Sequence, residues 1–337
     1  MQPDGLRTFI RYGAVDWVLV YRFNPEKVQP STFTEEECSR HIQAALGKDV
    51  EFEILSITIW STTPRIVESY RSSLVKNAFL AGDSAHTFSP TGGLGQNTGF
   101  GDVHNLVWKL LMVMNGHALD ILMDSYDEER ITVAVANARQ STVNEAKMDV
   151  LGQTINPASE RGHGSQEWEN EDFQYKVREA IQHNADHFDS LDLQLGMIYN
   201  KLPRPTDQNV SKFVQKAVPG ARLPHAWVEF GGKVDASSLD LVGYSDLTLL
   251  CPDLVLAHEL ESRLSANVRE LVQIKILGSH FTTNNTDWLD MLFTTQRNRA
   301  VLVRPDQHIA SLLDSTSSMV QAFRSINLEV PNPPSFS

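Results

Sequence analysis

The chain is poor in cysteine: it has only Cys38 and Cys251, which form neither a CxxC pair nor a group with metal-ligand spacing. This argues against a metal centre and favours a reducing compartment, the cytoplasm. Long apolar runs are also missing, since none approaches the ~18 residues of a membrane-spanning helix. The N-terminal residues lack a basic-then-apolar pattern, so no secretory signal is expected.

Positive charge is scarce as well. The sequence has 29 Lys and Arg residues against 42 Asp and Glu residues, which gives a formal net charge of -13. This balance argues against a nucleic-acid partner and against an anionic membrane surface. The length of 337 residues predicts two domains with enough chain to bury a sizeable core.

Closely spaced glycines are missing from the first part of the chain. The glycines before Gly82 are Gly5, Gly13 and Gly47, which are too far apart for a G-x-G-x-x-G turn. That turn belongs to a dinucleotide-binding βαβ unit, which needs about 30 residues or more. The sequence therefore lacks one half of a common dinucleotide site.

The most informative stretch runs from Ala78 to Asn97. Residues 78–81 predict a short strand that ends at Gly82, and a loop rich in proline and glycine follows. The loop leads into an amphipathic helix that stops near Gly116. The apolar stripe of this helix consists of Val103, Leu106, Val107, Leu110, Leu111 and Met114.

This arrangement has a chemical consequence. Gly92, Gly93 and Gly95 allow the backbone to approach a ligand closely. The free N–H groups and the dipole of the following helix favour negative charge at its start. Asp83, at the end of the expected strand, is well placed to accept hydrogen bonds from a sugar hydroxyl. We therefore expect a nucleotide site here.

At these residues the sequence resembles the FAD-dependent aromatic hydroxylases, the single-component flavin monooxygenases that include phenol hydroxylase and the polyketide hydroxylases. Gly82-Asp83 is similar to the family's second flavin fingerprint, in which the Asp holds the FAD ribose. The resemblance implies a set of cofactor-binding residues: Asp83, Pro90, Gly92, Gly93, Leu94, Gly95, Gln96 and Asn97. Later segments agree with the family in the same order: 125–130, 193–196, 219–225 and 303–306.

The resemblance implies a mixed α/β (α+β) fold. Residues 1–200 would form a partial FAD- and substrate-binding domain, with a substrate sheet at about 6–70 and the flavin loop and helices at about 71–200. After a linker at 201–205, residues 206–337 would form a thioredoxin-like α/β domain. The family's substrate sheet makes Trp17, Tyr21, Trp60 and Arg65 candidate pocket residues; the alternative is that they are ordinary sheet residues.

Local patterns predict further elements. Residues 6–23 favour one or two strands, and Thr34 is the expected N-cap of a helix that leads to Leu46. Ser125 and Glu128 favour a capping box at the start of a helix that ends at about 148. The other expected elements are a strand at 51–61, a loop at 152–171, a helix at 172–195, strands at 247–250, 271–277 and 300–303, and helices at 252–262 and 306–314.

The function that the resemblance implies is hydroxylation of a phenolic or other aromatic small molecule with FAD, NADPH and O2, in secondary metabolism or aromatic degradation, by a truncated chain. The alternative is a remnant without catalysis that binds a ligand or a partner. The macromolecular partner that we consider is either a second copy of this chain or a separately encoded N-terminal chain that completes the site. His86 is expected to make a structural hydrogen bond, and His183 and His187 to lie on a solvated face rather than at a metal.

Overall fold

The computed structural model describes residues 7–21, 23, 26, 28–46, 50–61, 63–159, 166–199, 209–293 and 299–328. The chain divides into two compact units. The first comprises Met1–Thr63, Ser89–Gly92 and Gln140–Phe188, and the second comprises Pro64–Phe88, Gly93–Arg139 and Asp189–Ser337. Helices and strands are mixed along the chain, which confirms the α/β class. The expected linker at 201–205 lies outside the described residues.

The first unit begins with a β-hairpin and a helix, as the local pattern predicts. Its elements are β1 (Arg7–Tyr12), β2 (Asp16–Tyr21), the 3-10 helix η1 (Pro30–Thr32) and α1 (Glu35–Leu46). The two strands pair antiparallel, with Phe9 opposite Leu19. Thr34 Oγ1 accepts a hydrogen bond from the backbone N–H of Glu37 at 3.3 Å, as an N-cap does.

The strand expected at 51–61 is wrong. Residues 50–61 belong to no strand, although the apolar side chains of Leu55, Ile57 and Ile59 alternate there and are exposed. A strand is defined by its ladder of hydrogen bonds to a neighbour, and no neighbour pairs with this segment within the described ranges. The alternation alone therefore does not produce a strand.

The long helix α3 (Asp124–Ser159) contributes its second half to the first unit, together with η4 (Gln166–Glu169), α4 (Glu171–His183) and α5 (Ala185–Phe188). The loop expected from 152 onward is wrong over its first eight residues, because each added residue of an established helix gains a hydrogen bond. Ser125 is not the N-cap: its hydroxyl donates to the Leu122 carbonyl at 2.7 Å, since η3 (Asp120–Met123) runs directly into α3.

The second unit begins with the short pair β3 (Arg65–Ile66) and β4 (His86–Thr87), separated by η2 (Gly82–Ser84). The strand expected at 78–81 is wrong, since only Phe79 forms an isolated bridge, to Arg71. The helix expected next is confirmed as α2 (Leu94–Met114), and Gly116 follows it at a φ of 72°.

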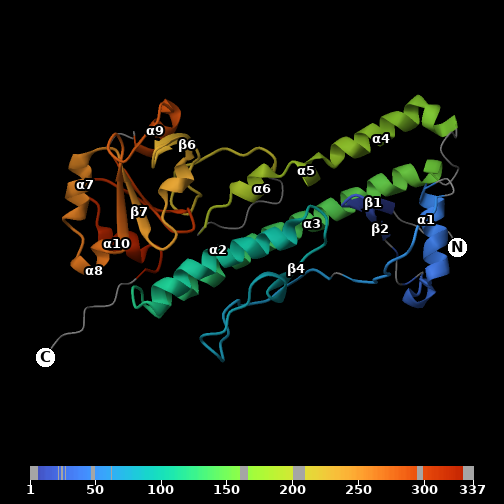
Figure 1. Ribbon diagram of the computed structural model, residues 1–337, viewed down its shortest axis with the longest axis horizontal. Helices are drawn as coiled ribbons and strands as arrows, with labels where there is room; N and C mark the ends of the chain where they lie inside the picture. Colours follow the sequence, from blue (N-terminus) through green and yellow to red (C-terminus); the bar gives the residue numbers. More distant parts are fainter. Residues whose placement is uncertain are drawn as a thin grey trace. The chain divides into compact units, whose positions relative to one another are not determined.

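The remainder of the second unit is built on a four-stranded sheet in the order β11-β10-β7-β8, in which β7 and β8 are parallel. The strands are β7 (Leu247–Cys251), β8 (Val272–Ile276), β10 (Ala300–Val303) and β11 (Ile309–Leu313). A second sheet has the order β6-β5-β9, formed by β5 (Trp227–Phe230), β6 (Lys233–Ser237) and β9 (Phe281–Thr282). The helices are α6 (Leu191–Leu195), η5 (Ser238–Leu241), α7 (Leu254–Glu261), α8 (Ala266–Arg269), α9 (Thr286–Phe293) and α10 (Met319–Arg324). Figure 1 shows β7 of the four-stranded sheet with α7 beside it.

The helix expected at 306–314 is wrong, because this segment contains β11. Gln307 adopts a φ of 63°, and the turn there reverses the chain so that β11 pairs antiparallel with β10. The apolar residues of 309–313 suit a buried strand as well as a helix, and pairing decides the outcome.

Two apolar cores cover the two faces of the four-stranded sheet. On one face, Leu249 of β7 packs with Leu260 of α7, Phe323 of α10 and Trp108 of α2. On the other face, Leu250 of β7 packs with residues of α9 and β5. The inner side of α2 is therefore part of the core of this unit.

Candidate functional site

The loop that carries Asp83 lies directly against α2. A Cβ atom added to Gly99 would lie 3.0 Å from the Gly82 Cα, closer than an ordinary contact, so this approach of the two backbones depends on Gly99 having no side chain. The backbone N–H of Gly82 donates to Oδ2 of Asp102 at 3.1 Å. This contact fixes the 3-10 turn η2, in which Asp83 is exposed. The Asp83 carboxylate has no partner among the described residues.

The start of α2 is also open to a ligand. Its N-cap is Gly93, with a φ of 64°, and among the described residues no side chain forms a cap hydrogen bond there. Free amides at a helix start, together with the helix dipole, stabilise a phosphate. Asn97 turns back onto the loop, since its Nδ2 donates to the Gly93 carbonyl at 2.8 Å.

Asp102 is the centre of a buried group of charges. Its Oδ2 pairs with Nε2 of His86 at 2.8 Å, and its Oδ1 accepts from Nε of Arg130 at 2.8 Å. Burial alone would raise the pKa of Asp102, but the His86 hydrogen bond and the Arg130 charge hold that pKa below its usual value. Asp102 is therefore ionised. The expectation of a structural hydrogen bond for His86 is confirmed.

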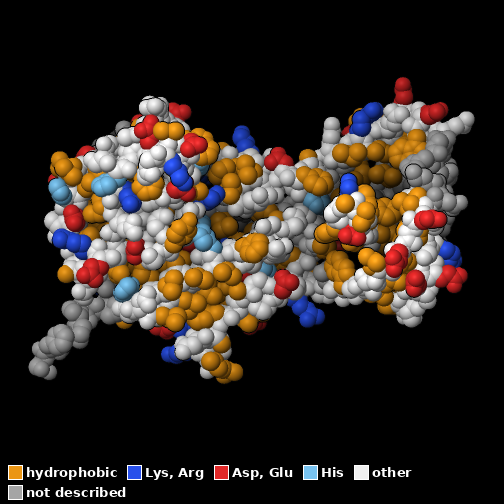
Figure 2. Space-filling model, viewed as in Figure 1, with side chains coloured by type: hydrophobic (Ala, Val, Ile, Leu, Met, Phe, Trp, Pro, Cys, Tyr) orange, Lys and Arg blue, Asp and Glu red, His pale blue; other side chains and the backbone are white. Residues whose placement is uncertain are grey.

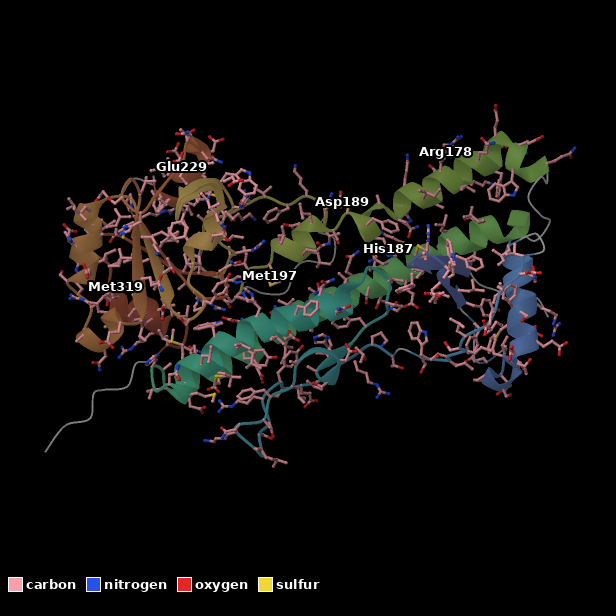
Figure 3. All side chains as sticks on the ribbon, in the orientation of Figure 1. Arg178, His187, Asp189, Met197, Glu229 and Met319 are labelled. Atoms are coloured by element: carbon pink, nitrogen blue, oxygen red, sulfur yellow. The ribbon has the colours of Figure 1, made fainter. Side chains whose placement is uncertain are left out.

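Arg130, on α3, connects this group to the segment after α6. Its guanidinium donates to the Thr98 carbonyl at 3.0 Å and to the Tyr199 hydroxyl at 3.2 Å. It also approaches the sulfur of Met197, which is labelled in Figure 3, at 3.7 Å. A Cβ atom on Gly101 would lie 2.7 Å from its Nη2, so a larger residue there would displace the guanidinium.

A second buried group joins α2 and α3 to the turn after β10. Glu129 binds Arg304 through both oxygens, at 2.5 and 2.9 Å, and accepts from Lys109 Nζ at 2.8 Å. Asp306 also pairs with Arg304 and accepts from Trp108 Nε1 at 3.2 Å. Burial would raise the pKa of Glu129, but the charges of Arg304 and Lys109 lower it to about 2. Burial lowers the pKa of Lys109 to about 8.

The residues expected to bind the cofactor fall in both units. Pro90 and Gly92 belong to the first unit, where Thr91 Oγ1 donates to the Ser141 carbonyl at 2.6 Å. The segment from Gly93 to Asn97 belongs to the second unit, where Leu94 is buried and Gln96 and Asn97 are exposed. The assignment of these residues, with Gly95, to the cofactor stays a prediction.

The four residues expected to line a substrate pocket also fall in both units. Trp17 and Tyr21 lie on β2 and Trp60 lies in the unpaired segment, all in the first unit, whereas Arg65 lies on β3 of the second unit. Trp17 and Trp60 are exposed, and Tyr21 stacks on His41 of α1 with ring centroids 5.0 Å apart. Their role as a substrate pocket stays a prediction.

Four charged residues of these groups are not among the site residues that the sequence predicts: Asp102, Lys109, Glu129 and Arg304. Glu129 and Arg304 lie in the segments 125–130 and 303–306, which already resembled the family, so those segments carried the signal. A different feature could have pointed to Asp102 and Lys109: they are the two residues of α2 that are Asp, Glu, Lys or Arg. In the described ranges, no three His, Cys, Asp or Glu side chains group as metal ligands.

The residues present fit one part of FAD. An exposed, unpartnered Asp83 suits a ribose diol, and the uncapped start of α2 suits a phosphate. None of the helices within the described ranges combines the length and apolarity needed to cross a membrane.

The fold is that of the flavin-dependent monooxygenases. The flavin-dependent monooxygenase PieE, solved with FAD and substrate, superposes with a TM-score of 0.81 at 23% identity, over 96% of this chain and 60% of PieE. Residues 6–141 match the family model described as an FAD binding domain.

Curated relatives point to the same group. The chain is 30% identical to the tetracenomycin A2 monooxygenase-dioxygenase of Streptomyces glaucescens, over 87% of this chain and 48% of the relative. It is 25% identical to phenol 2-monooxygenase of Pseudomonas sp. (strain EST1001), over 87% of this chain and 51% of the relative. The family model and these relatives support a place for the chain among the FAD-dependent aromatic hydroxylases. The chain spans about half the length of the curated relatives it matches.

Proposed function

We propose that this chain forms part of an FAD- and NADPH-dependent monooxygenase that hydroxylates a phenolic or other aromatic small molecule, in secondary metabolism or aromatic degradation. The observation that carries the proposal is the exposed Asp83 carboxylate, which has no partner among the described residues and sits on a turn held against α2. When bound, FAD supplies the chemistry with NADPH and O2.

In this proposal the chain's own residues bind and orient the cofactor. Asp83 accepts hydrogen bonds from ribose hydroxyls, and the amides from Gly93 to Asn97 face negative charge. The Asp102 carboxylate accepts a hydrogen bond from the backbone N–H of Gly82 and so holds this turn in place. Arg130 in turn donates a hydrogen bond to Asp102. Pro90 and Gly92 complete the loop and limit access of water to the reacting centre.

The substrate class rests on the relatives. Phenol 2-monooxygenase and the tetracenomycin A2 enzyme carry names that specify aromatic chemistry, and this supports an aromatic substrate here. Trp17, Tyr21 and Trp60 would contribute aromatic faces to such a ring, and Arg65 would attract a phenolate.

We also propose a thioredoxin-like domain for residues 206–337, following a first domain at 1–200. The order β11-β10-β7-β8, with a parallel β7-α7-β8 unit followed by a β10-β11 hairpin, supports this assignment. Cys251 is buried, and burial raises the pKa of its thiol to about 12, so this domain acts in packing rather than in dithiol exchange. Two free cysteines support a cytoplasmic location.

The proposal is tested with 18O2. The purified chain, supplied with FAD and NADPH, is incubated with phenol, catechol and a polycyclic phenol, and products are identified by mass spectrometry. Incorporation of one 18O atom into a substrate, dependent on NADPH, is the expected result. Oxidation of NADPH without labelled product for any aromatic compound would refute hydroxylation while leaving cofactor binding intact.

A further inference from the structure

Arg222 is a half-buried arginine whose side chain has no acceptor among the described residues. Its guanidinium takes part in no hydrogen bond and no ion pair with them. Burial lowers the pKa of this group, and no charge of the described chain opposes that shift. A guanidinium carries donors only, and donors that are removed from water without an acceptor cost free energy. The position of Arg222 therefore favours an acceptor from outside this part of the chain.

His308 lies beside Arg222. The two residues face each other in an isolated antiparallel bridge, with a backbone hydrogen bond of 2.8 Å on either side of the pair. Residues in this arrangement bring their side chains close together on one face. The ring of His308 is held in place, since its Nδ1 lies 2.8 Å from the Asp306 carbonyl oxygen and its centroid lies 4.4 Å from that of Tyr199. Its Nε2 has no hydrogen-bond partner among the described residues and is left for a ligand.

His104 of α2 is the third member of this group. Its side chain remains accessible to water, and it has no hydrogen-bond partner within the described ranges. Partial burial of the ring lowers the pKa of His104, and the charge of Asp306 raises it. The positive charges of His308, Arg222 and Arg130 lower that pKa further. His308 and Arg222 therefore lie near enough to His104 for the three side chains to act on one bound group.

The Asp306 carboxylate, which also acts on this group, is already engaged. Arg304 donates to both of its oxygens, and Trp108 and Asn105 donate to Oδ2. The charge of Asp306 is therefore offset by Arg304 within the buried network. This leaves Arg222 without a carboxylate and leaves the three side chains as a group of donors.

These three side chains suit a phosphate group. A guanidinium binds phosphate through two parallel hydrogen bonds, and an imidazole near neutral pH readily takes up the proton that a nearby anion favours. The net charge of -13, and the mixture of acidic and basic side chains on the face drawn in Figure 2, indicate that an anion would be held by local donors rather than by a broad basic surface. We propose that Arg222, His104 and His308 form a binding site for a phosphate group, either free phosphate or the phosphate ester of a small molecule.

This site is separate from the part of α2 that faces FAD in the proposed function. His104 lies about 15 Å along the helix from Leu94, since an α-helix rises about 1.5 Å per residue. The phosphate site therefore depends neither on flavin binding nor on hydroxylation, and its test omits FAD.

The test measures binding of inorganic phosphate and of glycerol 3-phosphate to the full chain by isothermal titration calorimetry, at an ionic strength kept constant with chloride. The site variant is Arg222→Gln. The matched control, Arg269→Gln, removes the same charge from an exposed arginine whose Nε lies 3.8 Å from Glu261. A second site variant, His104→Gln, changes an accessible residue and keeps the test decisive if Arg222→Gln does not fold.

We expect the wild type and the control to bind at one site with the same affinity. Binding to Arg222→Gln should be at least about tenfold weaker, because charge-assisted hydrogen bonds are lost. Binding to His104→Gln should be about two- to tenfold weaker. Without phosphate, thermal unfolding should show Arg222→Gln to be at least as stable as the wild type, because its guanidinium has no partner to lose.

The two probes distinguish the sources of the phosphate group. Tighter binding of inorganic phosphate would identify the free anion as the ligand, and tighter binding of glycerol 3-phosphate would identify a phosphate ester. Lack of binding of both probes at millimolar concentration, or equal affinity of Arg222→Gln and the wild type, would overturn the proposal. It would also be overturned if Arg222→Gln lost stability together with binding while His104→Gln bound like the wild type, since Arg222 would then have a structural role only.

Discussion

The Asp102 carboxylate accepts a hydrogen bond from Nε of Arg130 at 2.8 Å although both side chains are almost completely buried. Removing one charge of a buried pair leaves the other without compensation, which costs about 3 to 5 kcal/mol. We therefore expect Asp102→Asn to lower the free energy of unfolding by about that amount, measured by urea denaturation.

An exposed ion pair provides the control for this variant. Asp120 binds Arg71 at 2.7 Å, but its side chain is exposed to water. Asp120→Asn should cost less than about 1 kcal/mol. An equal decrease in the free energy of unfolding for the two variants would show that the buried Asp102–Arg130 pair stabilises the fold no more than an exposed pair does.

The buried Glu129 predicts a dependence of stability on pH. Its pKa falls from 4.5 to about 2 in the folded chain, so its contribution is fully present above pH 4.5 and is lost as the pH falls toward 2. The shift corresponds to about 3 kcal/mol. Glu129→Gln should remove this part of the dependence, whereas the exposed neighbour Glu128→Gln should give a curve parallel to the wild type. Parallel curves for both variants would contradict the assignment.

Two glycines of α2 should respond in opposite ways to alanine. A Cβ atom on Gly101 would meet Arg130 Nη2 at 2.7 Å, so Gly101→Ala should cost about 1 to 3 kcal/mol. A Cβ atom on Gly95 has only an ordinary contact with Phe88 at 3.9 Å, so Gly95→Ala should be neutral or stabilise the helix by up to about 1 kcal/mol. Thermal unfolding distinguishes them, and a stabilising Gly101→Ala would contradict the packing described.

The two cysteines should differ in reactivity. Cys251 is fully buried, and burial raises the pKa of its thiol to about 12, which disfavours the reactive thiolate at pH 8. Cys38 is partly exposed. Iodoacetamide followed by mass spectrometry should label Cys38 in the native protein and Cys251 only after unfolding. Rapid native labelling of Cys251 would show that the C-terminal sheet opens.

The sequence predicts the elements that have a clear local pattern, including the buried strands at 247–250, 271–277 and 300–303, and misassigns three segments whose local pattern is ambiguous. The helix that carries the apolar stripe from Val103 to Met114 and the one or two strands expected at 6–23 have clear periodicity and are confirmed. The local pattern of the segments at 51–61, 78–81 and 306–314 does not decide whether each forms a strand. That outcome depends on whether a neighbouring strand pairs with the segment.

The same reason limits prediction of the candidate site. Asp83 stands out because its glycine-rich surroundings are contiguous with it in the sequence. The network of buried charges does not stand out in the sequence, because its partners are far apart along the chain. Asp102 and Arg130 are separated by 28 residues, and Glu129 and Arg304 by 175 residues. Only folding brings these charges together.

The central claim is that Asp83 holds FAD, and a titration of the purified chain with FAD, followed by flavin fluorescence, tests it most directly. We expect saturable binding in the micromolar range and a dissociation constant about 10- to 100-fold higher for Asp83→Asn, because the amide keeps one acceptor oxygen but loses the negative charge and the second acceptor oxygen. Glu259→Gln, an exposed site on α7, should bind like the wild type. Lack of saturation up to millimolar FAD, or equal affinity for Asp83→Asn, would contradict the claim.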